Sequence, residues 1–300
     1  MVKTKEECIF QIIANIVMAI FSFCALLPIV LLFTCSLTAN DNLLRDGYNF
    51  IPRAWSFENY AYIFDTSSSK VLHAYFISFA LTCCGTVLGT VITMLLGYSI
   101  SRPGMPGRGV LTFLVFLTML FNGGLVPTYI NYTTVFHLKN TFFGLLIPSL
   151  LMNAFNVMLV KSYFITSIPE EILESARIDG AGEIRIFASI SAPMARPIIA
   201  TIALFVGIAY WNDWNNGYIY LTSATDLYSI QNLLNRMQEN LQFLVTNSAG
   251  LSSTNVGLAN IPSEGIRMSI AVLGVLPVVL VYPFIQNNFI KGITLGGVKG

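Results

Sequence analysis

Apolar residues occur in long stretches that are separated by short polar segments. A helix needs about 20 largely apolar residues to cross the hydrocarbon core of a bilayer. Six stretches are long enough, at residues 9–37, 71–100, 110–130, 141–160, 198–221 and 268–290. The pattern therefore predicts an all-α integral membrane protein with six transmembrane helices in a single domain, residues 1–300.

The composition fits a membrane location. Of the 300 residues, 55% are hydrophobic and 10% are charged, whereas about 25% of the residues of a soluble domain are charged. A net charge of +1 offers no strong attraction to nucleic acid, so we expect membrane lipid around the chain and no nucleic acid partner. The two histidines and five cysteines lack the spacing of metal ligands, and we predict no metal site.

Lysine and arginine are unevenly distributed over the connecting segments. With both termini in the cytoplasm, six of the 16 cationic residues lie outside, namely Arg45, Arg53, Lys70, Lys139, Arg236 and Arg267. The remaining ten lie inside, and two of them flank the short turn from Arg102 to Arg108. Cytoplasmic loops carry an excess of Lys and Arg, so we predict that both termini are cytoplasmic.

The segment between the fourth and fifth spans, residues 167–193, holds the densest charge in the chain. Ser167 is suited to cap a helix, Pro169 to its first turn, and the acidic pair at 170 and 171 to its positive end. Gly180 is suited to end that helix. A second helix, over residues 182–191, would share an apolar face formed by Ile184, Phe187, Ala188 and Ser191.

Such short helices are marginal in water by themselves, so we expect them to pack on something outside the bilayer. A docked partner protein is one explanation. The alternative is a solvated linker that lies on the membrane surface. The segment is the place where a partner would bind.

The same segment resembles the cytoplasmic signature of the permease subunits of ABC importers. That signature is Glu-Ala-Ala, three residues, Gly, nine residues, then Ile-x-Leu-Pro. In this chain the matching positions are Glu174, Ser175, Ala176, Gly180, Ile190, Ser191, Ala192 and Pro193, with the full spacing. Ser175 replaces the middle alanine and Ala192 replaces the leucine, and both changes keep the residues small.

Further motifs resemble the carbohydrate-uptake permeases of the maltose type, in their second-subunit branch. They are Pro52, Ser56, Asn59 and Tyr60 before the second span, Trp211, Asn212 and Trp214 in the fifth, and the glycine-rich terminus at 296–300. The sequence Phe-Asn-Gly-Gly-Leu-Val-Pro-Thr-Tyr at 121–129 is similar to permeases for complex oligosaccharides. The resemblance covers nearly the whole chain.

This resemblance implies a type I ABC importer permease fold in a bacterial cell membrane, with residues 167–193 as a coupling loop. Glu174, Ser175, Ala176, Arg177, Asp179 and Gly180 would then contact a cytoplasmic ATPase dimer. The other implied partners are a second homologous permease, an extracytoplasmic sugar-binding protein and the oligosaccharide itself. The chain would form half of the translocation pathway.

The chain contains no Gly-x-x-x-x-Gly-Lys-Ser/Thr phosphate loop. We therefore expect a transporter subunit that is not an enzyme and binds no cofactor, with ATP and Mg used by a separate ATPase. Two other functions stay open from the residues alone. One is an ABC permease for a non-sugar solute such as a peptide, and the other is a proton-coupled carrier, which Asp213 alone supports.

Asp213 is the one charged residue inside the six expected spans. A charge at the bilayer centre costs about 2.5–3.5 kcal/mol on insertion scales, so this side chain should face protein or water. It lies among residues that can stack on sugars or hydrogen-bond to them: Tyr210, Trp211, Asn212 and Trp214. The group is either a sugar contact in the pathway or a structural cluster near the outer interface.

Two asparagines lie in the fourth expected span, Asn153 and Asn156. A buried amide without a partner is costly. Interhelical hydrogen bonding is the favoured interpretation, and contact with sugar in the pathway is the alternative.

Overall fold

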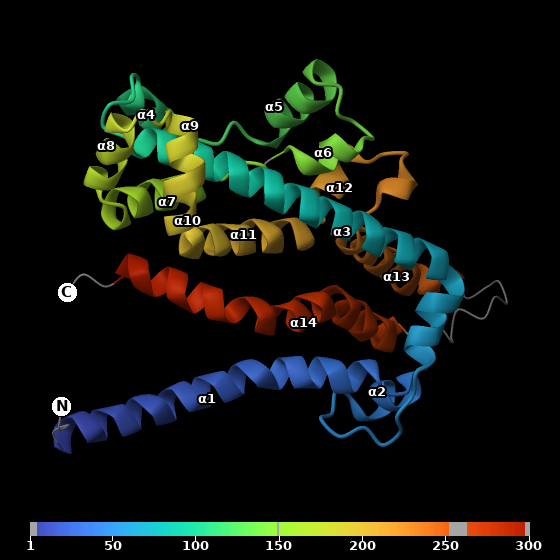
Figure 1. Cartoon of the computed structure of the whole chain (residues 1–300). Coiled ribbons are helices and arrows are strands. Elements are labelled where there is room, and N and C mark those ends of the chain that lie inside the picture. Colours follow the sequence, from blue (N-terminus) through green and yellow to red (C-terminus); the bar gives the residue numbers. More distant parts are fainter. Residues whose placement is uncertain (1–4, 149, 252–262, 298–300) are drawn as a thin grey trace. The chain divides into compact units, whose positions relative to one another are not determined.

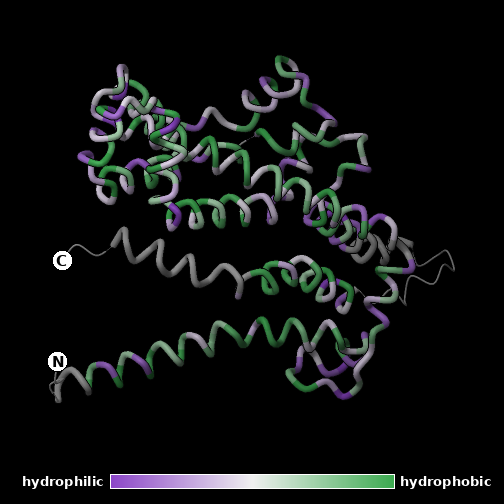
Figure 2. Tube along the Cα trace, viewed as in Figure 1, coloured by the Kyte–Doolittle hydropathy of each residue, from purple (hydrophilic) through white to green (hydrophobic). Residues whose placement is uncertain are grey.

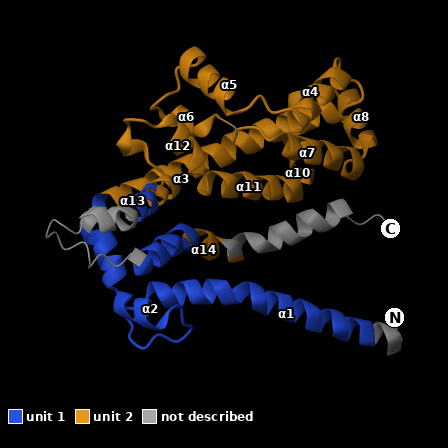
Figure 3. Cartoon of the chain, turned by 180° about the vertical axis from the view of Figure 1, so that it is seen from behind, with its two compact units in different colours: residues 1–69, 236–276 blue, residues 70–235, 277–300 orange. Residues whose placement is uncertain are grey.

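A computed structural model describes residues 5–148, 150–251 and 263–297. Within these ranges the regular structure is helical, apart from an isolated antiparallel bridge between Thr38 and Trp55 (Figure 1). The chain divides into two compact units (Figure 3). Unit 1 comprises residues 1–69 and 236–276, and unit 2 comprises residues 70–235 and 277–300.

The first half of the chain contains α1 (Lys5–Ser36), α2 (Asn40–Asp46), α3 (Glu58–Ser101), α4 (Arg108–Leu120), α5 (Leu125–Ile130), the π-helix η1 (Asn131–Val135) and α6 (Phe142–Leu146). The second half contains α7 (Ala154–Ser167), α8 (Glu170–Ile178), α9 (Glu183–Ile186), the π-helix η2 (Phe187–Ser191), α10 (Ala192–Met194), α11 (Arg196–Trp211), α12 (Asn215–Tyr220), the 3-10 turn η3 (Thr225–Leu227), α13 (Ile230–Leu251) and α14 (Ser263–Gly297).

Three of the described helices contain a stretch that is long and apolar enough to cross a bilayer. These stretches are Ile9–Ser36, Ser69–Ser101 and Glu264–Val281, and Figure 2 shows their apolar character along the chain. Two bent helix pairs raise the number to five if each pair is one span. The all-helical prediction is confirmed, whereas the expected six continuous spans are not all present.

The third expected span, 110–130, is broken. α4 ends at Leu120 and α5 begins at Leu125, and the two helices meet at 119°. Gly124 has φ +84°, a conformation that few residues other than glycine adopt. The side-chain oxygen of Asn122 accepts a hydrogen bond from the Gly124 amide. This local turn replaces the helical hydrogen bonds and produces the bend.

The fourth expected span, 141–160, is interrupted between α6 and α7. Pro148 has no amide hydrogen to donate, which disfavours a continued helix. Asn153 then begins a new helix, because its side-chain oxygen accepts a hydrogen bond from the Asn156 amide at 3.3 Å. An apolar pattern indicates that a segment belongs in lipid, but it does not detect a break made by a proline and a capping side chain.

In unit 2, α3 packs closely against α7 and α11. Gly85 faces the ring of Tyr210, and Gly97 faces Val160. A Cβ atom at either glycine would meet these side chains at distances that real structures do not tolerate. Small residues let membrane helices approach each other closely, so these glycines set the spacing of the helices that form the core of unit 2.

In unit 1, the end of α1, the start of α3 and the start of α14 are joined by hydrogen bonds. The Asn59 amide donates to the carbonyl oxygens of Ser36 and Thr38, at 3.3 and 3.1 Å. The hydroxyl of Ser269 also donates to the Ser36 carbonyl, and Tyr60 donates to the Ser36 hydroxyl. Asn59 and Tyr60, two of the residues that carried the resemblance, therefore stabilise unit 1.

Candidate functional site

The charged segment after α7 folds into two short helical pieces, here named the hairpin (residues 170–191). Its first helix, α8, ends at Ile178, and Gly180 supplies the stop that was predicted. Gly180 has φ +84°, its amide donates to the Arg177 carbonyl, and the Ala181 amide donates to the Ala176 carbonyl. These two bonds form a Schellman motif. No heavy atom lies within 4 Å of the position where a Cβ of Gly180 would lie.

The start of α8 differs from the prediction. Ser167 is the last residue of α7 and does not cap α8. Pro169 occupies the N-cap position without a side-chain hydrogen bond, and Ile168 before it is extended, as residues before proline tend to be. Glu170 and Glu171 do lie in the first turn of α8.

The second piece also differs. Ile184, Phe187, Ala188 and Ser191 were expected to share one apolar face, but Ile184 is 86% exposed, whereas Ser191 is fully buried, as is Ile186. Residues 187–191 form the π-helix η2, whose wider turn changes the angular spacing of side chains after Ile186. A face drawn for a regular α-helix therefore does not hold from Ile184 to Ser191.

The hairpin packs on its own chain. Leu173, Ala176 and Ile186 belong to one buried apolar cluster with Phe164 and Ile198. The hairpin therefore needs no partner protein to cover this inner face. Docking of a partner on the part of the hairpin that stays exposed remains a prediction.

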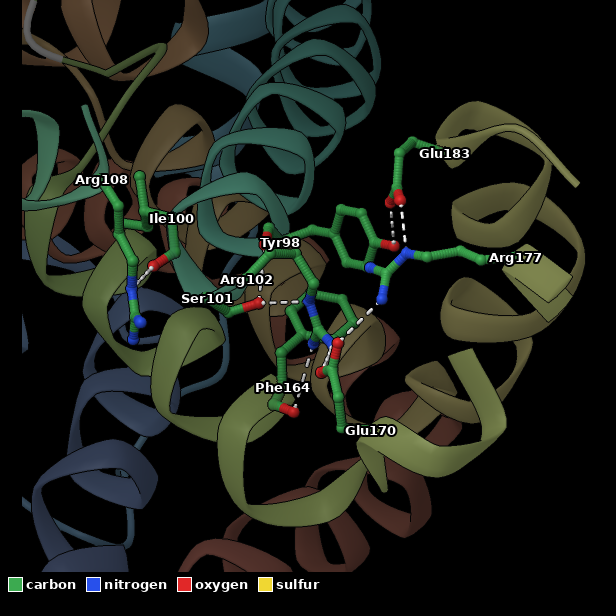
Figure 4. A network of polar contacts seen from close by, with 9 residues as sticks. All are labelled: Tyr98, Ile100, Ser101, Arg102, Arg108, Phe164, Glu170, Arg177 and Glu183. Atoms are coloured by element: carbon green, nitrogen blue, oxygen red, sulfur yellow. Dashed lines mark hydrogen bonds and ion pairs between the residues drawn. The ribbon is translucent and has the colours of Figure 1, made fainter. Parts of the chain in front are cut away.

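Arg102 joins the end of α3 to this hairpin (Figure 4). Its side chain is only 8% exposed, and its guanidinium contacts Glu170 at 2.8 Å. The same group donates to the Ser101 hydroxyl and to the Phe164 carbonyl, and it lies over the ring of Tyr98 at 4.9 Å. A buried charge is tolerated when it is paired and hydrogen-bonded.

Arg177 holds the two pieces of the hairpin together. Its guanidinium contacts Glu170 at 3.0 Å and Glu183 at 2.7 Å. The hydrogen bond and charge of Arg177 lower the pKa of Glu183, while Glu183 and then Glu170 raise the pKa of Arg177. Tyr98 also donates to Glu183, at 3.3 Å. Arg177 was predicted to contact a partner, but within this chain it is occupied by two carboxylates.

The same residues border a cavity of about 650 Å³. It is lined by Tyr98, Ser99, Arg102, Pro103, Gly104, Met105, Pro106, Glu170, Glu174, Arg177 and Glu183. The sequence indicated a role of Arg102 in membrane orientation only, whereas the structure pairs it with Glu170. The sequence did contain a signal for this pair. Arg102 directly follows an apolar span, and the charged segment contains acidic residues for which no partner was predicted.

Three signature residues lie on the solvent-exposed surface of the hairpin, here called its outer face, and one of them, Glu174, also borders the cavity. Glu174, Ser175 and Asp179 are exposed, and the Ser175 hydroxyl donates back to the Glu171 carbonyl. Ile178 is 86% exposed, as is Ile184 in α9. The hairpin thus presents two uncovered isoleucines and a carboxylate on an anchored framework. Ala176, by contrast, is buried in this chain's own core and is not available for a partner.

The residues predicted around Asp213 have mixed roles. Tyr210 is buried and donates to the Leu146 carbonyl at 2.7 Å. Asn216, which the sequence did not single out, donates to the carbonyls of Leu145 and Pro148. These carbonyls lie where the fourth expected span is interrupted. Polar backbone at membrane depth has to be hydrogen-bonded within the protein, so Tyr210 and Asn216 stabilise the interruption.

Asp213 itself lies between α11 and α12, where its carboxylate accepts a hydrogen bond from the backbone amide of Asn216 at 3.3 Å. Trp211 stacks on Tyr75, with ring centroids 6.3 Å apart. Asn212 and Trp214 are exposed. The structure thus assigns local structural contacts to Tyr210, Trp211 and Asp213 and leaves Asn212 and Trp214 uncovered.

The two asparagines of the fourth expected span also differ from each other. Asn153 is exposed and caps α7, which is a local contact and not an interhelical one. Asn156 is buried in α7. Among the described residues no group of three or more His, Cys, Asp or Glu side chains could hold a metal ion.

Residues 89–295 match the family model of the binding-protein-dependent transport system inner membrane component. The chain belongs to this family. It is a membrane permease subunit, not an enzyme, and its hairpin lies inside the matched region. The alternative hypothesis, that the chain is a proton-coupled carrier, is therefore excluded.

Curated relatives and a solved structure resemble the permease along nearly its whole length. The polygalacturonan/rhamnogalacturonan transport system permease protein YtcP of Bacillus subtilis is 34% identical over 93% of this chain and 94% of the relative. The protein LplC of the same species is 30% identical, covering 99% and 97%. A crystal structure of a bacterial ABC transporter involved in the import of the acidic polysaccharide alginate matches with a TM-score of 0.71 and 29% identity, covering 96% of this chain and 99% of that chain.

Proposed function

We propose that this permease forms half of the pathway by which an oligosaccharide enters a bacterial cell, driven by a separate ATPase that grips the hairpin. The observation that carries the proposal is the outer face of the hairpin. Ile178 and Ile184 are 86% exposed, and the carboxylate of Glu174 in the same hairpin is exposed as well. Exposed apolar side chains with a neighbouring charge are typical of a protein interface.

The anchoring of the hairpin supports this role. Its inner face is buried in the chain's own core, and its two helical pieces are joined by the ion pairs of Arg177 with Glu170 and Glu183. A rigid segment can transmit a displacement, whereas a loose linker would absorb it. Of the signature residues, Glu174, Ser175 and Asp179 would contact the ATPase, and Ala176, Arg177 and Gly180 would shape the hairpin.

We further propose a single domain with six crossings and both termini in the cytoplasm. The bent pair α4 and α5, the interrupted pair α6 and α7, and α11 would each form one crossing, in addition to the three long helices. The hydrogen bonds from Tyr210 and Asn216 support this count, because they satisfy the carbonyls that an interrupted helix leaves free. The excess of Lys and Arg on the inner side supports the orientation.

The remaining partners follow from the family. A second homologous permease would complete the pathway, an ATPase dimer would use ATP and Mg, and an extracytoplasmic binding protein would deliver the sugar. In the pathway, Asn212 and Trp214 are the candidates best placed for sugar contact, since both are exposed. The other candidates would mainly shape the wall of the translocation pathway: Asn153, Asn156, Tyr210, Trp211 and Asp213.

The substrate we propose is an oligosaccharide derived from an acidic polysaccharide. Two of the similar proteins are named for polygalacturonan/rhamnogalacturonan and for alginate, which are all rich in uronic acids. Cells that lack this permease should lose uptake of labelled oligogalacturonides and recover it with the restored gene. Unchanged uptake of oligogalacturonides and alginate oligomers, with loss of peptide uptake, would favour the peptide alternative.

Copurification tests the hairpin directly. The double variant Glu174→Gln/Ile184→Asp should insert normally but retain the ATPase roughly tenfold less well, which corresponds to a loss of about 1.4 kcal/mol. The matched control is Glu171→Gln, because Glu171 is an exposed carboxylate in the same helix. Equal recovery of the ATPase with the double variant, the control and the wild type would refute docking at this face.

A further inference from the structure

The ion pairs of the hairpin are part of a closed ring, which we name the charge ring: Tyr98, Arg102, Glu170, Arg177 and Glu183. Starting at α3, Arg102 contacts Glu170 at 2.8 Å. Glu170 contacts Arg177 at 3.0 Å, and Arg177 contacts Glu183 at 2.7 Å. Glu183 accepts from Tyr98, whose ring lies under Arg102. Figure 4 shows these side chains pointing toward one another from α3, α8 and α9.

The ring closes because each carboxylate has two partners. The two oxygens of Glu170 contact different arginines, one at the end of α3 and one in α8. The two oxygens of Glu183 likewise contact Arg177 and Tyr98. A displacement of α8 or α9 relative to α3 must therefore stretch at least one charge-assisted hydrogen bond, which is directional and strong.

Arg102 has the least freedom of the five. Three nitrogens of its guanidinium are engaged, with Glu170, with the Ser101 hydroxyl and with the Phe164 carbonyl of α7. Its side chain is 8% exposed, and the planar group lies over the rings of both Tyr98 and Phe164. Separation of the pair would leave a buried charge without its carboxylate, which is strongly unfavourable.

The apolar contacts of the hairpin cannot play the same part. Leu173, Ala176 and Ile186 pack against the core through dispersion and burial, and burial is not directional. Such a face resists separation but tolerates a small slide along the core. The charge ring resists the slide, because its bonds have fixed lengths and angles.

We propose that the charge ring is the mechanical link that transmits movement of the hairpin to the inner end of α3, with Arg102 as the positioning residue. This inference rests on the proposed docking of an ATPase to the hairpin. It adds that the docked face is connected to a long membrane helix through one buried guanidinium. Without that connection, the ATPase would still bind and hydrolyse ATP, but α3 would not follow the hairpin.

The test is nucleotide-dependent hydrogen exchange on the complete purified importer in detergent, with and without ATP plus vanadate. In the wild type, exchange should change both at residues 170–186 and at residues 92–101. In Arg102→Met the change at the hairpin should persist, while the change at residues 92–101 should fall about fivefold or more, the lower end of typical coupling between sites.

Arg108→Met is the matched control. Arg108 belongs to the same turn and donates to the Ile100 carbonyl, but it is outside the ring (Figure 4), so both changes should persist. Arg102→Lys serves if Arg102→Met does not assemble. It keeps the charge without the planar fork of donors, and the change at residues 92–101 should be smaller than in the wild type, with the change at the hairpin and ATP hydrolysis retained.

The outcomes separate the two proposals. One outcome is that the nucleotide-dependent changes in exchange at the hairpin and at residues 92–101 are the same in Arg102→Met or Arg102→Lys as in the wild type. That result would overturn the role of the charge ring but would not contradict the proposed docking. Loss of the ATPase from Arg102→Lys would also overturn it, because Arg102 would then support docking and not transmission. A wild-type hairpin that does not respond to nucleotide would refute the proposed docking itself.

Discussion

Two polar networks in unit 2 stabilise irregular backbone, and they use different chemistry. The hairpin relies on the charge ring, in which two arginines alternate with two glutamates. The interruption between α6 and α7 relies on neutral groups, namely the Tyr210 hydroxyl and the Asn216 amide. The difference follows from where each network is expected to lie, at the inner surface and within the bilayer.

Charge is useful where water or another charge can compensate for it. Glu183 is 56% exposed and Arg177 34%, so the hairpin side of the ring stays partly hydrated. Inside a bilayer an ion costs far more than an amide or hydroxyl that reaches a carbonyl. The comparison teaches that the charged network suits a part that moves and binds, and the neutral network a part that has to stay intact.

The largest effect is expected from Asn216→Leu. This change leaves the carbonyls of Leu145 and Pro148 without the amide that they share. Each buried polar group without a partner costs about 1–3 kcal/mol, so the permease should lose about 3 kcal/mol and accumulate poorly in membranes. Thermal unfolding in detergent and membrane abundance measure the loss.

Asn212→Leu provides the control for that experiment. Asn212 lies only four residues away and is exposed, so its replacement should leave stability nearly unchanged. Equal stability of the Asn212 and Asn216 variants would remove the distinction between the two networks, since the neutral one would then contribute nothing.

A smaller effect is expected at the end of α8. Gly180→Ala forces a residue with a Cβ into a φ of +84°, which costs about 1 kcal/mol. The open space around this position leaves strain as the only cause. Gly180→Asn should cost less, because asparagine tolerates the left-handed region better. Hydrogen exchange of the α8 amides measures both, and a rank order with Asn worse than Ala would contradict the explanation.

The smallest effect is the pH dependence of the Arg177–Glu183 pair. Arg177, followed by Tyr98 and Arg102, holds the pKa of Glu183 below its ordinary value of 4.5. The stabilisation is therefore present above pH 4.5 and is lost as the pH falls through the lower, folded-state pKa. The melting temperature of the wild type minus that of Glu183→Gln should be constant from about pH 8 to 5 and shrink below pH 4.5. If the difference in melting temperature already shrinks between about pH 8 and 5, another titrating group is responsible.

Much of the hairpin could be predicted from its residues. The stop at Gly180 follows from glycine's freedom at positive φ, and the acidic first turn follows from the helix dipole. The inner face was not predictable in the same way, because Ile184 and Ile186 have the same side chain and only packing against distant residues such as Phe164 and Ile198 decides which one is buried. Arg102 and Glu170 are 68 residues apart, and no local pattern pairs them.

The sequence by itself determined that the chain lies in a lipid bilayer and which family it belongs to. Long apolar stretches require lipid, and the spacing from Glu174 to Pro193 marks a permease of a binding-protein-dependent importer. Only the tertiary structure decided which polar groups serve the chain itself and which remain for partners. The reason is that a side chain becomes available to a partner only after the fold has left it uncovered, and burial depends on residues far away along the chain.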